Sequence, residues 1–127
     1  MRIFPAIILG MIVLCPTNRL QAEDWPGWRG PRGDGSSLEQ NIPTRWSQKD
    51  NIAWKVEVPG VGYASPVVLG DAVFLVTCDE KTKERILLCL DRRTGRELWR
   101  RVVIRAPLEA IHRLNSRASS TPATDGL

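Results

Sequence analysis

The segment Leu90-Asp91-Arg92-Arg93-Thr94-Gly95-Arg96-Glu97-Leu98-Trp99 reads as the end of one β-strand, a tight turn and the start of the next strand. A short apolar run of strand length precedes it. Asp91 and Thr94 can hydrogen-bond the backbone of the turn, and Gly95 provides a position where φ can be positive. Trp99 falls on the outgoing strand, where its ring can cover a neighbouring sheet. An ordinary β-hairpin with a buried tryptophan is the alternative interpretation.

The spacing of Asp91, Thr94, Gly95 and Trp99 resembles the tryptophan-docking motif, D-x-x-T-G-x-x-x-W, of the pyrroloquinoline-quinone (PQQ) type β-propellers. In that family the tryptophan stacks between adjacent blades, while Asp and Thr hold the turn that presents it. Residues 25–35 read W-x-x-W-R-G-P-x-G-x-G, which is similar to the opening of secreted bacterial members of the same family. The resemblance implies an all-β fold built from antiparallel four-stranded blades.

Strand patterns follow one another at short spacing through the middle of the chain. Gly70-Asp71 is typical of a hairpin turn, and 79–85 is a charged hairpin loop. The predicted strands are Asn51–Val58, Ser65–Leu69, Ala72–Cys78, Ile86–Leu90 and Glu97–Ile104. Residues 65–104 therefore predict four consecutive antiparallel strands, which is the content of one propeller blade.

A second copy of the pattern begins near the end of the sequence. Ala64–Gly70 aligns with Ser120–Gly126 at an offset of 56 residues (120 − 64). The excess over the roughly 40–45 residues of a compact blade falls in 105–117. We expect 52–127 to be the first part of a propeller, one blade plus the start of the next. The chain would then be an N-terminal fragment that stops at Leu127 in mid-motif.

The first 22 residues have the layout of a secretory signal peptide. Arg2 precedes an apolar run that is short for a membrane span, and Ala22 stands before two acidic residues. The alternatives are an uncut membrane anchor and a lipoprotein modified at Cys15, although Leu14 stands where a small residue is expected. We expect cleavage after Ala22 and a secreted or periplasmic protein that meets the membrane only through this peptide.

Residues 23–51 are rich in Pro, Gly and Ser and contain Trp25, Trp28 and Trp46. Neither a helical nor a strand period is present, and the segment is too aromatic for a flexible linker. We expect an irregular N-terminal strap whose tryptophans dock on a later surface.

Charge gives little information about partners. The full chain has 18 basic and 14 acidic side chains, and loss of Arg2 and Arg19 lowers the net charge from +4 to +2. Eight arginines lie between Arg92 and Arg117 against Glu97 and Glu109. They could form a basic face for an anionic partner, or could be solvated arginines along strand edges that discourage aggregation. No aromatic platform accompanies them, so no nucleic-acid partner is expected.

Cys78 and Cys89 would remain after removal of the signal peptide, and export predicts an oxidising compartment for them. A hairpin loop centred near Lys83–Glu84 would place them opposite each other, as a disulfide requires; two buried free thiols are the alternative. They lack C-x-x-C spacing, and His112 is the single histidine, so no metal site is expected.

Polar residues precede both copies of the repeat. In related propellers an H-x-x-N-S-x-A-S-x-T-P run like 112–122 leads into the innermost strand, near the central channel. The resemblance implies that a ligand or peptide at the channel mouth would meet Tyr63, Ser65, His112, Asn115 and Ser119. Alternatively, these side chains cap backbone groups at blade edges.

Two functional classes follow from the resemblance. One is a non-catalytic binding or scaffold propeller, like the outer-membrane assembly propeller (BamB-like), with an unknown protein or small ligand at the channel mouth. The other is the N-terminal part of a PQQ-dependent dehydrogenase, whose family uses PQQ with a calcium ion and a catalytic Asp. None of the enzyme's ligands can be matched in this sequence, and fold does not fix function. We therefore favour the binding propeller, with no catalytic residue and no cofactor.

Overall fold

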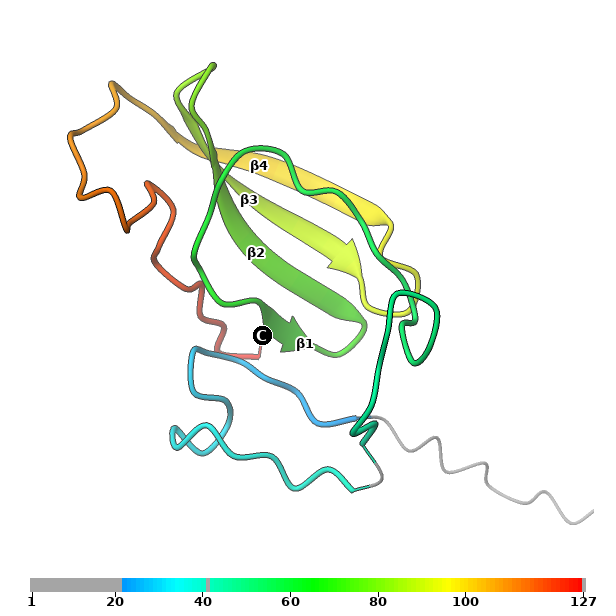
Figure 1. Cartoon of the computed structure of the whole chain (residues 1–127). Helices are drawn as coiled ribbons and strands as arrows, with labels where there is room; N and C mark the ends of the chain where they lie inside the picture. The colour runs from blue at the N-terminus through cyan, green and yellow to red at the C-terminus, as the bar shows by residue number, and fades with distance from the viewer. Residues whose placement is uncertain (1–21, 41, 127) are drawn as a thin grey trace, which may run out of the picture.

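The computed structural model describes residues 22–40 and 42–126; the predicted signal peptide lies outside the described residues except for Ala22. These residues form an all-β structure with one four-stranded antiparallel sheet in the order β1-β2-β3-β4 (Figure 1). The strands are β1 Val67–Leu69, β2 Ala72–Asp79, β3 Glu84–Asp91 and β4 Glu97–Arg105. The prediction of four consecutive antiparallel strands over 65–104 is confirmed. Within the described ranges, no helix is long and apolar enough to cross a membrane.

The prediction of a strand at Asn51–Val58 is wrong. The segment is extended but joins no ladder in the part of the chain that the structure describes. It arches across the sheet towards β1 (Figure 1), and only at Val61 does the backbone pair with β2, through two 3.0 Å hydrogen bonds with Cys78. Its alternating pattern is only partly used for burial, because Trp54 and Val58 are half-buried whereas Ile52 and Val56 are exposed.

The core lies on β2 and β3, the two inner strands. Directly paired residues share a face of the sheet, so Val73 with Leu90 and Thr77 with Ile86 belong to one face, and all four are buried. Every residue of β4 is exposed, because β4 has only one hydrogen-bonded neighbour and little packs against it.

The predicted pairing of Cys78 with Cys89 is wrong. The loop between β2 and β3 is Glu80–Lys83, so Cys78 lies opposite Arg85, and Cys89 lies opposite Phe74. Four residues along a strand is about 13 Å, well beyond the Cα separation of a disulfide. Both thiols are free and buried, and burial raises the pKa of each. The alternative of two buried thiols is the one that the structure contains.

The N-terminal strap contacts the sheet through one of its tryptophans. The backbone of Trp25 pairs with Val68 of β1 through hydrogen bonds of 2.7 and 2.9 Å. Trp28 and Trp46 remain 66% and 69% exposed, so the expectation that the strap tryptophans dock is wrong for these two. The strap therefore extends the sheet at the short β1 edge with its backbone.

The second copy of the repeat lies beside the first. The backbone N–H of Ser65 donates to Thr121 Oγ1 at 3.1 Å, and these residues occupy equivalent positions in the two copies. Thr124 N–H donates to the carbonyl of Pro26 at 3.1 Å. Residues 120–126 form no strand, but these contacts place them next to β1 and the strap.

Candidate functional site

The turn between β3 and β4 is held by Asp91 and Thr94, as the sequence predicts. Asp91 Oδ1 accepts hydrogen bonds from the backbone N–H of Thr94 at 2.7 Å and from its hydroxyl at 2.6 Å. The N–H of Gly95 donates to the carbonyl of Asp91 at 2.8 Å, and Gly95 has φ of +72°. The turn is thus a closed Asx-type turn that needs glycine at its last position.

The side chain that packs on this turn is the indole of Trp54. Trp54 Nε1–H donates to the carbonyl oxygen of Arg92 at 2.8 Å. Its ring covers Gly95 so closely that a Cβ there would lie 2.5 Å from a ring carbon. The absence of a side chain at Gly95 therefore allows the positive φ and leaves a flat surface on which the indole ring packs. The tryptophan in the Asn51–Val58 pattern was the available signal for this contact, which the sequence analysis missed.

Trp99, the tryptophan of the same motif, lies on β4 and makes a different contact. Its ring is tilted by 51° against Phe74, with centroids 6.0 Å apart, and it remains 39% exposed. Together with Val67 and Leu87 these rings line a hollow of about 210 Å³, closed on one side by Pro122–Thr124. Trp54 is thus docked on the turn, whereas Trp99, the tryptophan of the motif, lies half exposed on β4.

Acid is expected to weaken this turn. Hydrogen bonds from the Thr94 hydroxyl and then from its backbone N–H lower the folded-state pKa of Asp91 below 3.8. A lowered folded pKa means that the contribution to stability is present above the unfolded value and is lost as pH falls through the folded value. Urea unfolding between about pH 5 and pH 2 should therefore show a smaller loss of stability for Asp91→Asn than for the unchanged protein. Equal losses in the two proteins would exclude this role of Asp91.

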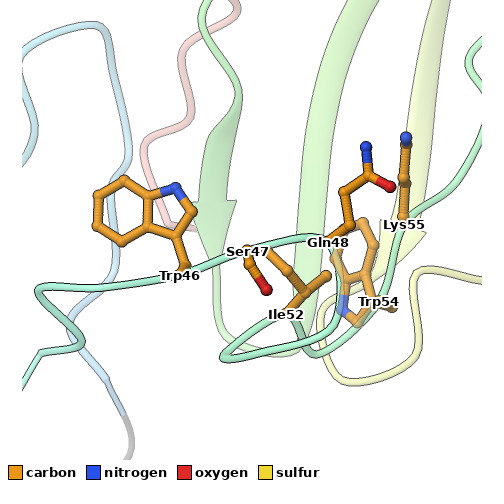
Figure 2. A pocket seen from close by; sticks show the side chains of 6 residues that line it. All are labelled: Trp46, Ser47, Gln48, Ile52, Trp54 and Lys55. Carbon is orange, nitrogen blue, oxygen red and sulfur yellow. The ribbon is translucent and has the colours of Figure 1, made fainter.

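An open groove of about 510 Å³ lies beside the docked indole. Figure 2 shows Trp46 and Trp54 at its two ends, with Ser47 and Ile52 between them in this view, and Gln48 and Lys55 above Trp54. The outer end is formed by the exposed Trp46 ring, and the inner end by the ring that covers Gly95. The groove is mostly apolar, with one cationic side chain at its rim.

Three of the five predicted mouth residues come together, around a serine that the sequence analysis did not select. Ser116 Oγ accepts the N–H of Tyr63 at 3.1 Å and lies 3.0 Å from Ser119 Oγ, while Ser119 also donates to Asn115 Oδ1 at 2.6 Å. Ser116 is buried. These polar groups fix the loop that carries the second repeat, which is the backbone-capping alternative for Asn115 and Ser119.

The other two predicted mouth residues are placed separately. His112 closes a local turn, since its carbonyl accepts the N–H of Asn115 at 2.9 Å and its Nδ1 accepts that of Leu114 at 3.3 Å. Ser65 contributes its backbone N–H to Thr121. Tyr63 is 59% exposed, and Trp28 lines a separate shallow hollow together with 119–121. The surface here therefore presents aromatic rings and hydroxyls.

The arginine-rich region is partly neutralised by ion pairs. Of its eight arginines, four pair with carboxylates: Arg92 with Asp24, Arg100 with Glu97, Arg105 with Glu84 and Arg117 with Glu80. Most of these pairs are exposed, and each contributes roughly 0–1 kcal/mol. These ion pairs therefore reduce the positive charge of the region. Among the described residues, no group of three or more His, Cys, Asp or Glu is placed to hold a metal ion.

Comparison of the chain with family models, with curated proteins and with solved structures finds no match.

Proposed function

We propose that the exported chain is the first part of a PQQ-type β-propeller that acts as a binding or scaffold module and has no catalytic role of its own. The observation that carries the proposal is the indole of Trp54 seated on the Asp91–Gly95 turn. The turn binds a tryptophan from another segment, and the sheet's own motif tryptophan, Trp99, is half exposed. A repeating unit that stacks on its neighbours requires both features.

Two further contacts support stacking. Ser65 and Thr121, at equivalent positions of the two copies of the repeat, are joined by a hydrogen bond. The hollow beside Trp99 is closed by residues of the second copy. Under this proposal 65–105 is one blade, 120–126 begins the next, and Trp54 comes from the extended segment that precedes the blade.

The binding role is supported by the exposed aromatic rings of this surface, because the predicted polar side chains Asn115 and Ser119 are used within the loop. Asn115, Ser116 and Ser119 hydrogen-bond one another and the loop backbone, whereas Tyr63 and Trp28 present their rings to solvent. Exposed aromatic rings beside hydroxyl groups favour recognition of a protein or small ligand. Under this proposal the partner is a separate molecule that binds at the channel mouth.

The proposal is tested on the full-length exported protein by titration with PQQ and Ca²⁺. Visible absorbance and an artificial electron-acceptor assay with alcohols and aldoses are the readouts. A binding propeller gives neither a bound chromophore nor turnover at high cofactor concentration. A bound chromophore with turnover would replace this proposal with the PQQ-dependent dehydrogenase. A protein that stays in the cytoplasm would contradict the export on which the proposal depends.

A further inference from the structure

Glu23, the first residue after the predicted cleavage point, is the centre of the strap. Its carboxylate accepts hydrogen bonds from Arg32 at 2.5 and 2.9 Å and from the Ser37 hydroxyl at 3.1 Å. The Arg32 contact is the main cause that lowers the pKa of Glu23 to about 2. Its backbone N–H donates to Glu39 Oε1. The two ends of the 23–39 loop are therefore joined through Glu23.

The same point joins the strap to the sheet. Asp24 accepts the N–H of Gly70 at 2.8 Å and lies 3.4 Å from Arg92 Nη1. Arg92 Nη2 donates to the carbonyl oxygen of Ala22 at 3.0 Å. Trp25 follows with its backbone pair to Val68. The Ala22–Glu23 bond thus lies where the contacts that fix the strap begin.

We propose that cleavage of the Ala22–Glu23 bond converts the Glu23 nitrogen into an ammonium group that forms an ion pair with the Glu39 carboxylate and locks the strap. A signal peptidase supplied by the host adds water across this bond. The Ala22 carbonyl carbon takes the hydroxyl and leaves with residues 1–22 as a carboxylate, and the Glu23 nitrogen takes a proton. Near neutral pH the new amine, with an ordinary pKa of about 7.7–8.0, binds a further proton.

The existing geometry favours this exchange. The nitrogen already points at a Glu39 carboxylate oxygen, so a charge-assisted hydrogen bond replaces a neutral donor without rearrangement. Glu39 and Asp24 attract the ammonium, while Arg32 and Arg92 repel it; the charge of Arg32 is already balanced by the Glu23 carboxylate and that of Arg92 by Asp24. Arg92 loses the Ala22 carbonyl but keeps Asp24 and Gly70.

The inference rests on the proposed export, and the first step of its test separates the two. The full-length precursor is expressed in a bacterium, the cell is fractionated, and the exported protein is analysed by intact mass and N-terminal sequencing. Export with Glu23 as the first residue is expected. A chain kept uncut in the cytoplasm would overturn both proposals, whereas an exported chain that starts elsewhere, or whose N-terminal Glu23 has cyclised and lost its amine, would overturn this inference alone.

The second step measures the pKa of the Glu23 α-amino group by NMR titration of the processed protein. Pairing with Glu39 should raise it by about one unit above the ordinary 7.7–8.0. Glu39→Gln should return it to the ordinary range, and Glu57→Gln, which removes one exposed carboxylate elsewhere, should leave it raised. An unchanged α-amino pKa in Glu39→Gln would overturn the ion pair.

Discussion

Replacing Gly95 with alanine is expected to lower the free energy of unfolding of the protein by about 3 kcal/mol. Alanine at a positive φ costs about 1 kcal/mol, and loss of the Trp54–Arg92 hydrogen bond costs about 1 more. The remaining ~1 kcal/mol comes from apolar surface of the ring returned to water. The new Cβ would lie 2.5 Å from the Trp54 ring, so the ring must leave its seat. Urea unfolding gives the value.

Gly33→Ala is the matched control for this substitution. Gly33 has φ of +70°, nearly the same as Gly95, but a Cβ there meets nothing within 4 Å. Its loss should be limited to the backbone cost of about 1 kcal/mol. The difference between the two variants isolates the contact with the indole. Equal losses at both glycines would show that the ring contributes nothing at the turn.

The second large effect is expected for Trp54→Ala, again with a loss of about 3 kcal/mol. The substitution removes the hydrogen bond to Arg92 and the cover over Gly95, while the ring is only partly buried, so the loss falls at the low end for large aromatic residues. Trp46 at the other end of the groove is 69% exposed, and Trp46→Ala should cost less than about 1 kcal/mol. Urea unfolding of both variants measures the two losses.

The two losses at the turn should not add. Once Gly95→Ala has displaced the ring, Trp54→Ala has little left to remove, so the double variant should lose clearly less than the sum of the single losses. Full additivity would mean that the indole and the turn do not interact. A Trp46→Ala variant that is as unstable as Trp54→Ala would instead place the stabilising contact in the groove and not at the turn.

The strands were predictable because their signals are local. Gly70-Asp71 closes a hairpin, the charged residues after Asp79 close another, and each apolar run between such turns pairs with its neighbour in sequence. The Cys78–Cys89 pairing was wrong because register depends on the exact loop, here Glu80–Lys83, where Lys83 takes a φ of +60°. A shift of the loop centre by two residues moves each partner by four.

The docking partner was not predictable, because it comes from a distant segment. The motif was read correctly as a turn held by Asp91 and Thr94, but nothing local shows that its seat receives Trp54 and not Trp99. Ser116 was missed for a similar reason, since its burial and its bond to Tyr63 join residues more than fifty positions apart. Side-chain contacts of this kind depend on the packing of the whole sheet.

Hydrogen exchange at the five indole N–H groups, followed by NMR, tests the central claim most directly. Among the described residues, the Trp54 indole is the one whose N–H donates a hydrogen bond, to the carbonyl of Arg92. Its signal should exchange the slowest of the five, and the protection should be lost in Gly95→Ala and kept in Gly33→Ala. A Trp54 indole that exchanges as fast as that of exposed Trp46 would contradict the docking of Trp54 on the Asp91–Gly95 turn.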